Sequence, residues 1–399
     1  MSSSNVDNFI AALEHSNRVR VVDLYLWSDF GGSTSPGGVV AAEKILAVMQ
    51  VPFPELTKLQ LTSDANTAPV IPDSFLGGSV PPRLRIFQLS GIPFPGSPKL
   101  LSSATHLVAL MLSNIPYSGY ISPEAIVALV SALSSLRTLW LKFRSLPDPE
   151  SSIPPPLKRS ILSALDEFCF EGTPEYLEEL VTRIDAPQLN HMQITLFDQI
   201  DLDCPPLAQF IDRTPTLRAR NNAHVQFGKW SSVTLIAQSR AVEIVTSCSN
   251  TERDRQLWSI TQTCHFSLPP PCAVEHLYIE SHLRWSGRVS GLHTIENTQW
   301  LELLRPFTMT KKFYTTREFA LCIAASLQEL VGARTTEVVP NLQHISVERF
   351  KPSGPFEAKI EPFVAARQLL GHPITISEYG PRSWADAPRG WKWTKDPDT

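Results

Sequence analysis

The sequence lacks the segments that direct a protein into or across a membrane. Its first residues, Met1–Asn8, contain neither the basic block nor the apolar block of a signal peptide. The nearest approach to a transmembrane helix, Ala125–Leu133, is far shorter than the roughly 20 residues that such a helix needs. No asparagine stands in an Asn-x-Ser/Thr glycosylation sequon. We therefore expect an intracellular protein, cytoplasmic or nuclear, that does not contact a membrane.

Paired cysteines and an excess of positive charge are also missing. The cysteines form no Cys-x-x-Cys pair and most lie in apolar surroundings, so we interpret them as buried thiols rather than as disulfides or zinc ligands. The formal net charge is −4 and the pI is near 6.2, which gives no general affinity for nucleic acid. The cysteines stand at positions Cys169, Cys204, Cys248, Cys264, Cys272 and Cys322.

Motifs of catalysis and cofactor binding are absent as well. There is no Gly-x-Ser-x-Gly, His-Glu-x-x-His or Gly-x-Gly-x-x-Gly. Gly31–Gly38 has the glycines of a phosphate loop without the following lysine, so we interpret it as a surface loop. His276, His282 and His293 have no usual metal-ligand spacing, and Glu178-Glu179 is interpreted as a solvated face. We predict no enzyme activity, no cofactor and no metal site; an enzyme with an unrecognised site is the alternative from another class.

What the sequence does contain is a recurring helix-and-strand unit. In its clearest copy, Ser122 suits a helix N-cap and Pro123 the first helical position, which predicts a helix from there. Leu136, Leu139 and Leu141 follow with the spacing Leu-x-x-Leu-x-Leu, and the last two alternate as in a strand. A helix, a short turn and a strand of this spacing constitute one leucine-rich repeat.

The same strand spacing recurs six times in succession. Counting from the first residue of each copy gives steps of 28, 23, 29, 29 and 24 residues, close to the roughly 20–29 residues of this repeat type. The recurrence predicts an α/β leucine-rich-repeat solenoid, a horseshoe with a curved parallel sheet on the concave face, about nine to eleven units and no separate second domain. The six copies begin at Leu56, Leu84, Leu107, Leu136, Leu165 and Leu189.

The central residues of these copies should stack in one buried row. Between the strands, apolar stripes predict helices over residues 98–104, 123–133, 174–184, 317–331 and 360–370. The capping logic of Ser122 repeats at Thr173, which also precedes a proline and a glutamate. The residues expected in the row are Leu59, Phe87, Leu110, Leu139, Phe168 and Met192.

The repeat pattern weakens between Cys204 and Ile236. Arg218 and Arg220 occupy positions where apolar residues should face inward, so we expect Arg220 to stay out of the core. Two short apolar segments in the same stretch, 224–227 and 233–236, predict a small hairpin in place of a full repeat.

Beyond this break, strands are predicted at Val242–Thr246, 274–279, 312–315, 342–347 and 374–377. We assign residues 1–379 to one solenoid with an irregular break at about 204–236. Residues 380–399 form a C-terminal tail with three tryptophans, which either folds over the last repeat or is disordered.

Several longer phrases of the sequence resemble the large F-box/leucine-rich-repeat-like family of mushroom-forming fungi. One is Pro52-Phe-Pro-Glu-Leu-Thr-Lys-Leu-Gln-Leu. The resemblance covers nearly the whole chain. The other phrases that carry it are Val70–Ser79, Gly119–Ala125, Thr173–Leu180 and Gln328–Gln343.

The resemblance implies a role in ubiquitination. Members of the family are described as substrate receptors of Skp–cullin–F-box ubiquitin ligases, in which an N-terminal F-box docks the Skp adaptor and the repeats hold the substrate. Here the first helix of the array is predicted to begin at Asn8, and no Leu-Pro-x-Glu-like segment precedes it. We therefore expect this chain to lack the F-box, so that Skp and cullin would be partners only if an F-box is supplied elsewhere.

The remaining candidate for function is the outward side of the strands. In a leucine-rich-repeat horseshoe the alternate strand positions face the concave side, and partners bind there. Ala109 and Cys169 fall among these outward positions. The outward residues that we predict to bind a partner are Lys58, Gln60, Gln88, Met111, Trp140, Lys142, Glu167, Glu171, His191, Gln193 and Tyr278.

Met111 and Trp140 are the unexpected members of this set, because large apolar side chains are placed where water should be. Such residues are typical of interface hot spots, and single exposed apolar residues are also common. The alternative is that the segment Leu146–Pro156 covers Trp140, which then serves packing alone. We predict a monomeric, non-catalytic protein-binding scaffold; the alternative is a ligase substrate-recognition subunit.

Overall fold

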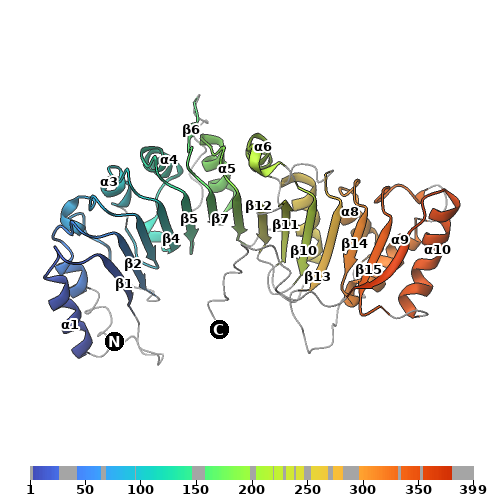
Figure 1. Cartoon of the computed structure of the whole chain (residues 1–399), viewed down its shortest axis with the longest axis horizontal. Coiled ribbons are helices and arrows are strands. Elements are labelled where there is room, and N and C mark those ends of the chain that lie inside the picture. Colours follow the sequence, from blue (N-terminus) through green and yellow to red (C-terminus); the bar gives the residue numbers. More distant parts are fainter. Residues whose placement is uncertain are drawn as a thin grey trace. The chain divides into compact units, whose positions relative to one another are not determined.

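The computed structural model (Figure 1) describes most of the chain. The chain divides into two compact units. Unit 1 is Met1–Leu189 and unit 2 is Asn190–Thr399. Both are mixed α/β with mostly parallel strand pairing, which confirms the predicted class; that they form one solenoid domain stays a prediction. The described residues are 3–26, 43–63, 69–94, 96–145, 158–197, 204–218, 220–227, 231–237, 240–246, 253–267, 273–281, 296–330, 334–350 and 354–379.

In the described part of unit 1, the main sheet contains six strands that are paired in parallel and in chain order. Each strand after the first begins two residues after the first leucine of a predicted copy, as the spacing requires. The strands are β1 (Val21–Leu26), β2 (Lys58–Ser63), β3 (Ile86–Ser90), β4 (Ala109–Ile115), β5 (Thr138–Phe143) and β7 (Glu167–Gly172).

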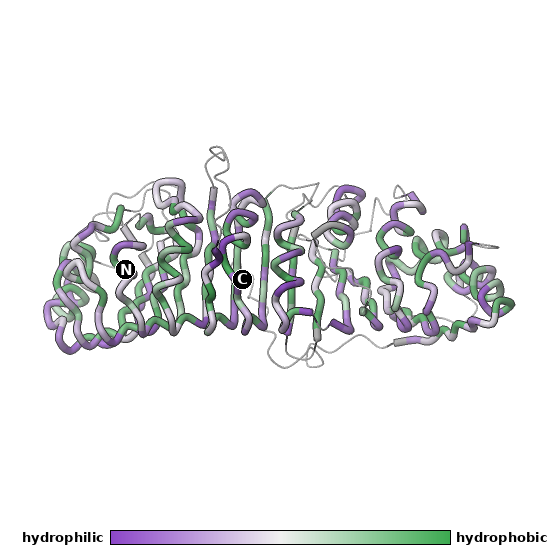
Figure 2. Tube along the Cα trace, turned by 90° about the horizontal axis from the view of Figure 1, so that it is seen from above, coloured by the Kyte–Doolittle hydropathy of each residue, from purple (hydrophilic) through white to green (hydrophobic). Residues whose placement is uncertain are grey.

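The core of unit 1 follows the alternation of these strands. Leu59, Phe87, Leu110, Leu139 and Phe168 pair in register from one strand to the next, and all are fully buried. Figure 2 shows hydrophobic and hydrophilic residues alternating along the elements. The predicted row is therefore confirmed as far as Phe168. The predicted sixth residue belongs to unit 2.

Helices and single turns of helix connect the strands of unit 1. Ser122 caps α4 as predicted, because its Oγ accepts a hydrogen bond from the backbone N–H of Ala125 at 3.3 Å. Thr173 makes no such side-chain bond at the start of α5. The elements are α1 (Ser3–Leu13), residues 43–48, η1 (Phe75–Gly78), α3 (Ser97–Leu101), η2 (Tyr117–Gly119), α4 (Pro123–Ala132) and α5 (Pro174–Arg183), with a two-stranded sheet of β6 (Ser160–Ile161) and β8 (Ile184–Asp185).

Successive repeats of unit 1 approach each other closely at Gly91. Its φ angle is +69°, in the left-handed region that favours glycine. Its backbone N–H donates to the Ser113 carbonyl at 3.0 Å. A Cβ at this position would stand 2.0 Å from the carbonyl oxygen of Ser63, in the preceding repeat. The turn after β3 therefore fits between its neighbours only without a side chain.

The described residues of unit 2 form eight strands whose spatial order departs from chain order. From one edge the order is β9, β12, β11, β10, β13, β14, β15, β16. β11 is antiparallel to both of its neighbours, whereas β9 with β12, β10 with β13, β13 with β14, β14 with β15 and β15 with β16 pair in parallel. The strands are β9 (His191–Leu196), β10 (Asn222–Phe227), β11 (Ser231–Ala237), β12 (Arg240–Thr246), β13 (His276–Ser281), β14 (Lys312–Thr315), β15 (His344–Glu348) and β16 (Thr375–Tyr379).

The predicted hairpin is present as β10 and β11, but it does not replace a repeat. The helix α6 (Pro205–Arg213) and β10 form a helix-strand unit, and β11 and β12 lie between β10 and β9 as an added antiparallel pair. β12 runs parallel to β9, and β10 runs parallel to β13. The strands on both sides of the added pair therefore keep the same direction. β12 was predicted as the resumption of the repeats, and it is instead part of the added pair.

Arg220 also departs from the prediction, because its side chain is buried with 8% exposed. Its Nε and Nη2 atoms have no hydrogen-bond partner among the described residues. Burial lowers the pKa of the guanidinium to about 10, against the opposing attraction of Asp212. The arginine lies directly before β10, where the chain enters the sheet, so it is enclosed by packing rather than by ion pairing.

The helices of unit 2 pack against one another in sequence, α7 with α8, α8 with α9 and α9 with α10. Two of them, α7 and α8, were not predicted. Trp300 in α8 is fully buried and its ring lies 5.6 Å from that of Phe319 in α9. No described helix is long and apolar enough to cross a membrane. The helices are α6, α7 (Arg253–Gln262), continued by a π-helical turn to Ser267, α8 (Asn297–Leu304), α9 (Arg317–Gln328) and α10 (Pro355–Leu369).

Candidate partner-binding surface

The open face of unit 1 is the side of its sheet that the helices leave uncovered. Tyr176 of α5 packs on the inward residues Phe143 and Phe170, with ring centroids 4.8 and 5.8 Å away, so the inward side is the helix side. The alternate strand residues point the other way. The predicted partner-binding residues of unit 1 are all half-buried on this open face: Lys58, Gln60, Gln88, Met111, Trp140, Lys142, Glu167 and Glu171.

Strand register brings these residues into rows across the open face. Gln60, Gln88, Met111 and Trp140 pair in that order over four successive strands. Directly paired side chains have Cβ atoms about 5 Å apart. Lys142 pairs with Glu171 in an adjoining row. The residues that the sequence places far apart therefore form one continuous surface.

Two predicted outward residues, Ala109 and Cys169, are buried instead. Cys169 pairs with Trp140 in register, and its Sγ lies 3.8 Å from Glu167 Oε1. Ala109 pairs with Ile86 and Thr138. Both side chains are shorter than their neighbours, so the taller groups shield them from water.

Trp140 is held in place by polar groups at its edge and on its face. Its indole Nε1 donates a hydrogen bond to Glu167 Oε1 at 3.1 Å. The ammonium nitrogen of Lys142 lies 5.1 Å from the ring centroid, within the range of a cation–π contact. We call Met111, Trp140, Lys142, Glu167 and Glu171 the Trp140 cluster. It presents a fixed aromatic and thioether surface with a charged rim.

The charges of the cluster are not fully solvated. Burial raises the pKa of Glu171, and the nearby Lys142 ammonium acts in the opposite direction. The segment Leu146–Pro156, the predicted alternative cover for Trp140, lies outside the described residues. The indole of Trp140 is half-buried, so a bound partner could bury the rest of the ring.

In unit 2 the ring of Phe227 packs on Trp300 and Phe319 of the helices, so the open face is the opposite side of the sheet, and it carries the other predicted residues. His191 and Gln193 are half-buried, and Gln193 Nε2 donates to Glu243 Oε2 at 3.1 Å. Tyr278 is only 5% exposed, contrary to its prediction as an open contact residue. Its ring is stacked between those of His224 and Tyr314, with both centroid distances 4.3 Å.

The stack explains why Tyr278 is buried. His224, Tyr278 and Tyr314 pair in register on three neighbouring strands. The spacing between such strands, about 4.8 Å, nearly matches the separation of stacked rings. Sequence reasoning missed His224 and Tyr314, because their alignment depends on which strands become neighbours.

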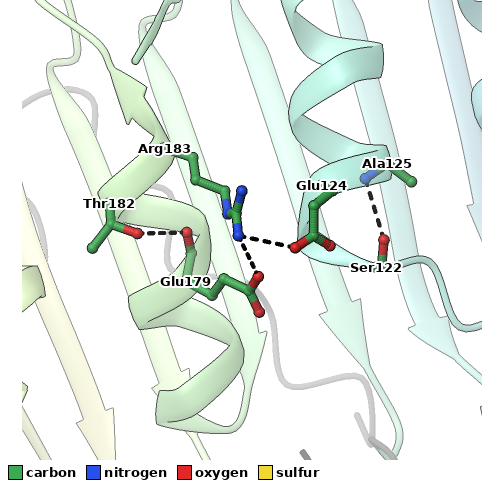
Figure 3. Close-up of polar contacts among 6 residues, drawn as sticks. All are labelled: Ser122, Glu124, Ala125, Glu179, Thr182 and Arg183. Atoms are coloured by element: carbon green, nitrogen blue, oxygen red, sulfur yellow. Dashed lines mark hydrogen bonds and ion pairs between the residues drawn. The ribbon is translucent and has the colours of Figure 1, made fainter. Parts of the chain in front are cut away.

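A charged cluster occupies the helix side of unit 1. Figure 3 shows the Arg183 guanidinium between Glu124 of α4 and Glu179 of α5, at 2.9 and 2.7 Å from their Oε1 atoms. Hydrogen bonding to Glu179 lowers the pKa of Glu124, while burial raises the pKa of Glu179. Glu179 was predicted to lie on a solvated face, and it is instead half-buried and paired with Arg183 of the same helix. Arg183 joins α5 to α4 through its contact with Glu124.

We also searched the described part of the chain for a metal site, a reactive cysteine and a ligand cavity. No group of three or more His, Cys, Asp or Glu residues there is arranged to hold a metal ion. Burial raises the pKa of the Cys264 thiol to about 12, so this cysteine stays protonated. A cavity between Leu89, Phe94 and Leu112 measures about 10 Å³, room for one water molecule. His282, His293, Gly31–Gly38 and the C-terminal tail lie outside the described residues.

No protein-family model and no curated protein sequence matches the chain. Among solved structures, the chain is similar to the leucine-rich repeat-containing protein LegL7 from Legionella pneumophila. The match covers 89% of this chain and 99% of that one, with 12% sequence identity and a TM-score of 0.29.

Proposed function

We propose that this chain is a non-catalytic protein-binding scaffold of the leucine-rich-repeat type, and that a partner protein binds the Trp140 cluster. The repeat type is supported by the strand-and-helix alternation of unit 1 and by its buried row of Leu and Phe residues. In such arrays the uncovered sheet face is the usual binding surface.

The observation that carries the proposal is the state of Trp140. An indole that serves only the core would be buried among apolar groups, whereas Trp140 stands half-buried on the open face. Its hydrogen bond to Glu167 and its contact with Lys142 fix the ring before any partner arrives. A fixed aromatic side chain loses little conformational entropy on binding, which is why tryptophans are frequent hot spots.

The test compares the wild-type chain with the double variant Trp140→Ala and Met111→Ala. Tagged full-length proteins are used to capture partners from an extract of the source organism, followed by mass spectrometry. Tyr117→Ala is the matched control, because Tyr117 is exposed but lies in η2 and not on the open face. A partner that binds at the Trp140 cluster is retained by wild type and control and lost with the double variant.

The expected loss for the purified partner is about 1–4 kcal/mol of binding free energy. Partner binding that is equal in all three proteins would remove the open-face assignment. Recovery of a Skp adaptor and a cullin with the wild-type chain would extend the proposal to the substrate-receptor role that the family resemblance implies.

A further inference from the structure

Three basic side chains stand in line on the open face of unit 2. His276, Lys312 and His344 are the first residues of β13, β14 and β15 and pair in register. Side chains in register on parallel strands point to the same face, with neighbouring strands about 4.8 Å apart. We call these three residues the basic row. It extends over about 10 Å, two strand spacings.

Lys312 is the centre of this row and has no counter-ion within the described part of the chain. Its side chain is exposed, whereas the adjacent Lys311 places its Nζ 2.7 Å from Glu275 Oε1. The charge of Lys312 acts on the row itself. Together with burial, which is the larger effect, it lowers the pKa of His344.

His344 is fixed in orientation by the edge strand β16. Its Nδ1 lies 2.6 Å from Thr375 Oγ1, and its Nε2 lies 2.9 Å from Ser377 Oγ. Both hydroxyl oxygens can accept a hydrogen bond from an imidazolium. The ring can therefore keep its place when it takes up a proton.

The aromatic stack supports the other end of the row. Tyr314 lies two residues after Lys312 on the same face, and its ring centroid is 6.3 Å from that of His276. Tyr278 fills the space beside it. The row thus stands along a closely packed layer of rings, which limits the rearrangement that binding would require.

We propose that the basic row binds a short acidic segment of a partner protein. Its carboxylates lie on Lys312 and His276, and His344, whose two ring nitrogens are held by Thr375 and Ser377, adds only its positive charge when it is protonated. A single carboxylate or phosphate group is too small to lie near all three across about 10 Å, whereas successive acidic residues can. The ammonium of Lys312 attracts anions and repels metal ions. This site lies in unit 2 and does not depend on the Trp140 cluster.

The other rows of the same face limit the length of the ligand. Glu280 and Glu348 lie on this face four residues further along β13 and β15 than His276 and His344, about 13 Å away. Glu243 lies on β12, three strands from β13. They would repel a long polyanion such as a nucleic acid. The negative net charge of the chain acts in the same direction.

The test uses a fluorescein-labelled octaglutamate peptide and the full-length chain at low salt. Lys312→Gln should weaken binding about fivefold, the upper range for an exposed ion pair, and Lys312→Glu should abolish it. Lys311→Gln is the matched control and should change the affinity less than about twofold, because Lys311 already pairs with Glu275. Adding salt should weaken the binding of wild type.

Three results would overturn the proposal. The first is no saturable binding of octaglutamate by wild type. The second is an equal effect of the two glutamine variants, which would indicate non-specific attraction. The third is tighter binding of a single-stranded thymidine oligonucleotide of equal charge, which would indicate a nucleic-acid site.

An independent readout is the titration of His344 by NMR, assigned with His344→Gln. Octaglutamate should raise the pKa of His344, because its carboxylates offset the repulsion from Lys312. In the Lys312→Gln variant, the pKa of His344 should already be higher without peptide, and octaglutamate should raise it less than in wild type. If octaglutamate leaves the pKa of His344 unchanged in wild type, the proposal is contradicted. The titratable or charged groups on the surrounding strands and their first turns are His224, Glu275, Tyr278, Glu280, Lys311, Tyr314, Glu348 and Glu378.

Discussion

Unit 1 and unit 2 share the alternation of strand and helix, but aromatic side chains on their open faces have different surroundings. Trp140 pairs in register with Met111 and Cys169, neither of them aromatic, and is half-buried. Tyr278 pairs with His224 and Tyr314 and is 5% exposed. Equivalent strand positions therefore yield an accessible ring in one unit and a packed ring in the other. The identity of cross-strand neighbours decides which.

The two units also differ in whether a buried arginine has an ion-pair partner. Arg183 in unit 1 is 7% exposed and contacts two carboxylates, Glu124 and Glu179. Arg220 in unit 2 is equally buried but has no ion-pair partner among the described residues. Regular repeats bring matched charges together on successive helices, whereas the added strands of unit 2 leave a charge enclosed without one.

The largest expected effect tests the close stacking of unit 1. Gly91→Ala should lower the free energy of unfolding by about 3 kcal/mol or more, because the backbone conformation is strained for alanine and the Cβ meets the Ser63 carbonyl. Gly371→Ala is the matched control. It has a φ of +79° with no atom within 4 Å of the new Cβ, and should cost only about 1 kcal/mol. Urea unfolding followed by circular dichroism measures both; equal losses would show that repeat packing at Gly91 is not tight.

The second prediction separates a packed ring from an accessible one. Tyr278→Ala should cost about 3 kcal/mol of folding stability, since a buried aromatic ring is removed from a stack. Trp140→Ala should cost about 1 kcal/mol, because the indole is only half-buried. The same denaturation experiment compares them. A greater loss for Trp140→Ala would favour the packing role over the binding role.

A third comparison concerns the two arginines. Arg183→Met should destabilise the chain by about 2 kcal/mol, because it leaves the carboxylates of Glu124 and Glu179 together without a cation. This loss is smaller than that for breaking a fully buried ion pair, because Glu124 is partly exposed to solvent. Arg220→Met should be neutral or stabilising by about 1 kcal/mol, because it replaces an unpaired buried charge by an apolar side chain. Thermal unfolding of both variants at pH 7 checks the signs, and a loss with Arg220→Met would reveal a partner for its guanidinium.

The smallest expected effect is a pH dependence in the Trp140 cluster. Burial raises the pKa of Glu171 in the folded chain. A carboxyl group with a raised folded pKa contributes stability below its unfolded pKa and loses it as the pH rises through the folded value. Glu171→Gln should therefore stabilise the chain by less than about 1 kcal/mol at pH 7 and have no effect at pH 3. Urea unfolding at the two pH values checks this; an equal effect at both would exclude the ionisation of Glu171 as its cause.

The periodic part of unit 1 was predictable because it depends on local spacing. Leu139 and its partners are buried for the reason that the sequence suggests, since each alternate strand residue must face the helices. The cap at Ser122 was predictable for a similar reason, because the donor lies three residues away. The outward set around Trp140 follows from the same alternation, and only the small side chains at Ala109 and Cys169 were misplaced.

The remaining features depend on contacts between distant residues. Arg183 reaches Glu124 across 59 positions of the chain, and no local pattern signals the pair. Tyr278 is buried by rings that approach it only after β10, β13 and β14 become neighbours. The position of β11 and β12 in the sheet likewise depends on contacts between distant residues. The sequence indicates a hairpin there, but not that it would enter the sheet beside β9.

The added pair β11 and β12 has a consequence for how such a sheet changes in length. An even number of inserted strands restores the original chain direction, whereas a single inserted antiparallel strand would reverse the direction of every later strand relative to those before it. Without this pair, α6 and β10 would be an ordinary unit following β9, and α7 would lead from it to β13. Parity therefore constrains insertions and deletions at this point, and homologues that differ here should differ by whole hairpins.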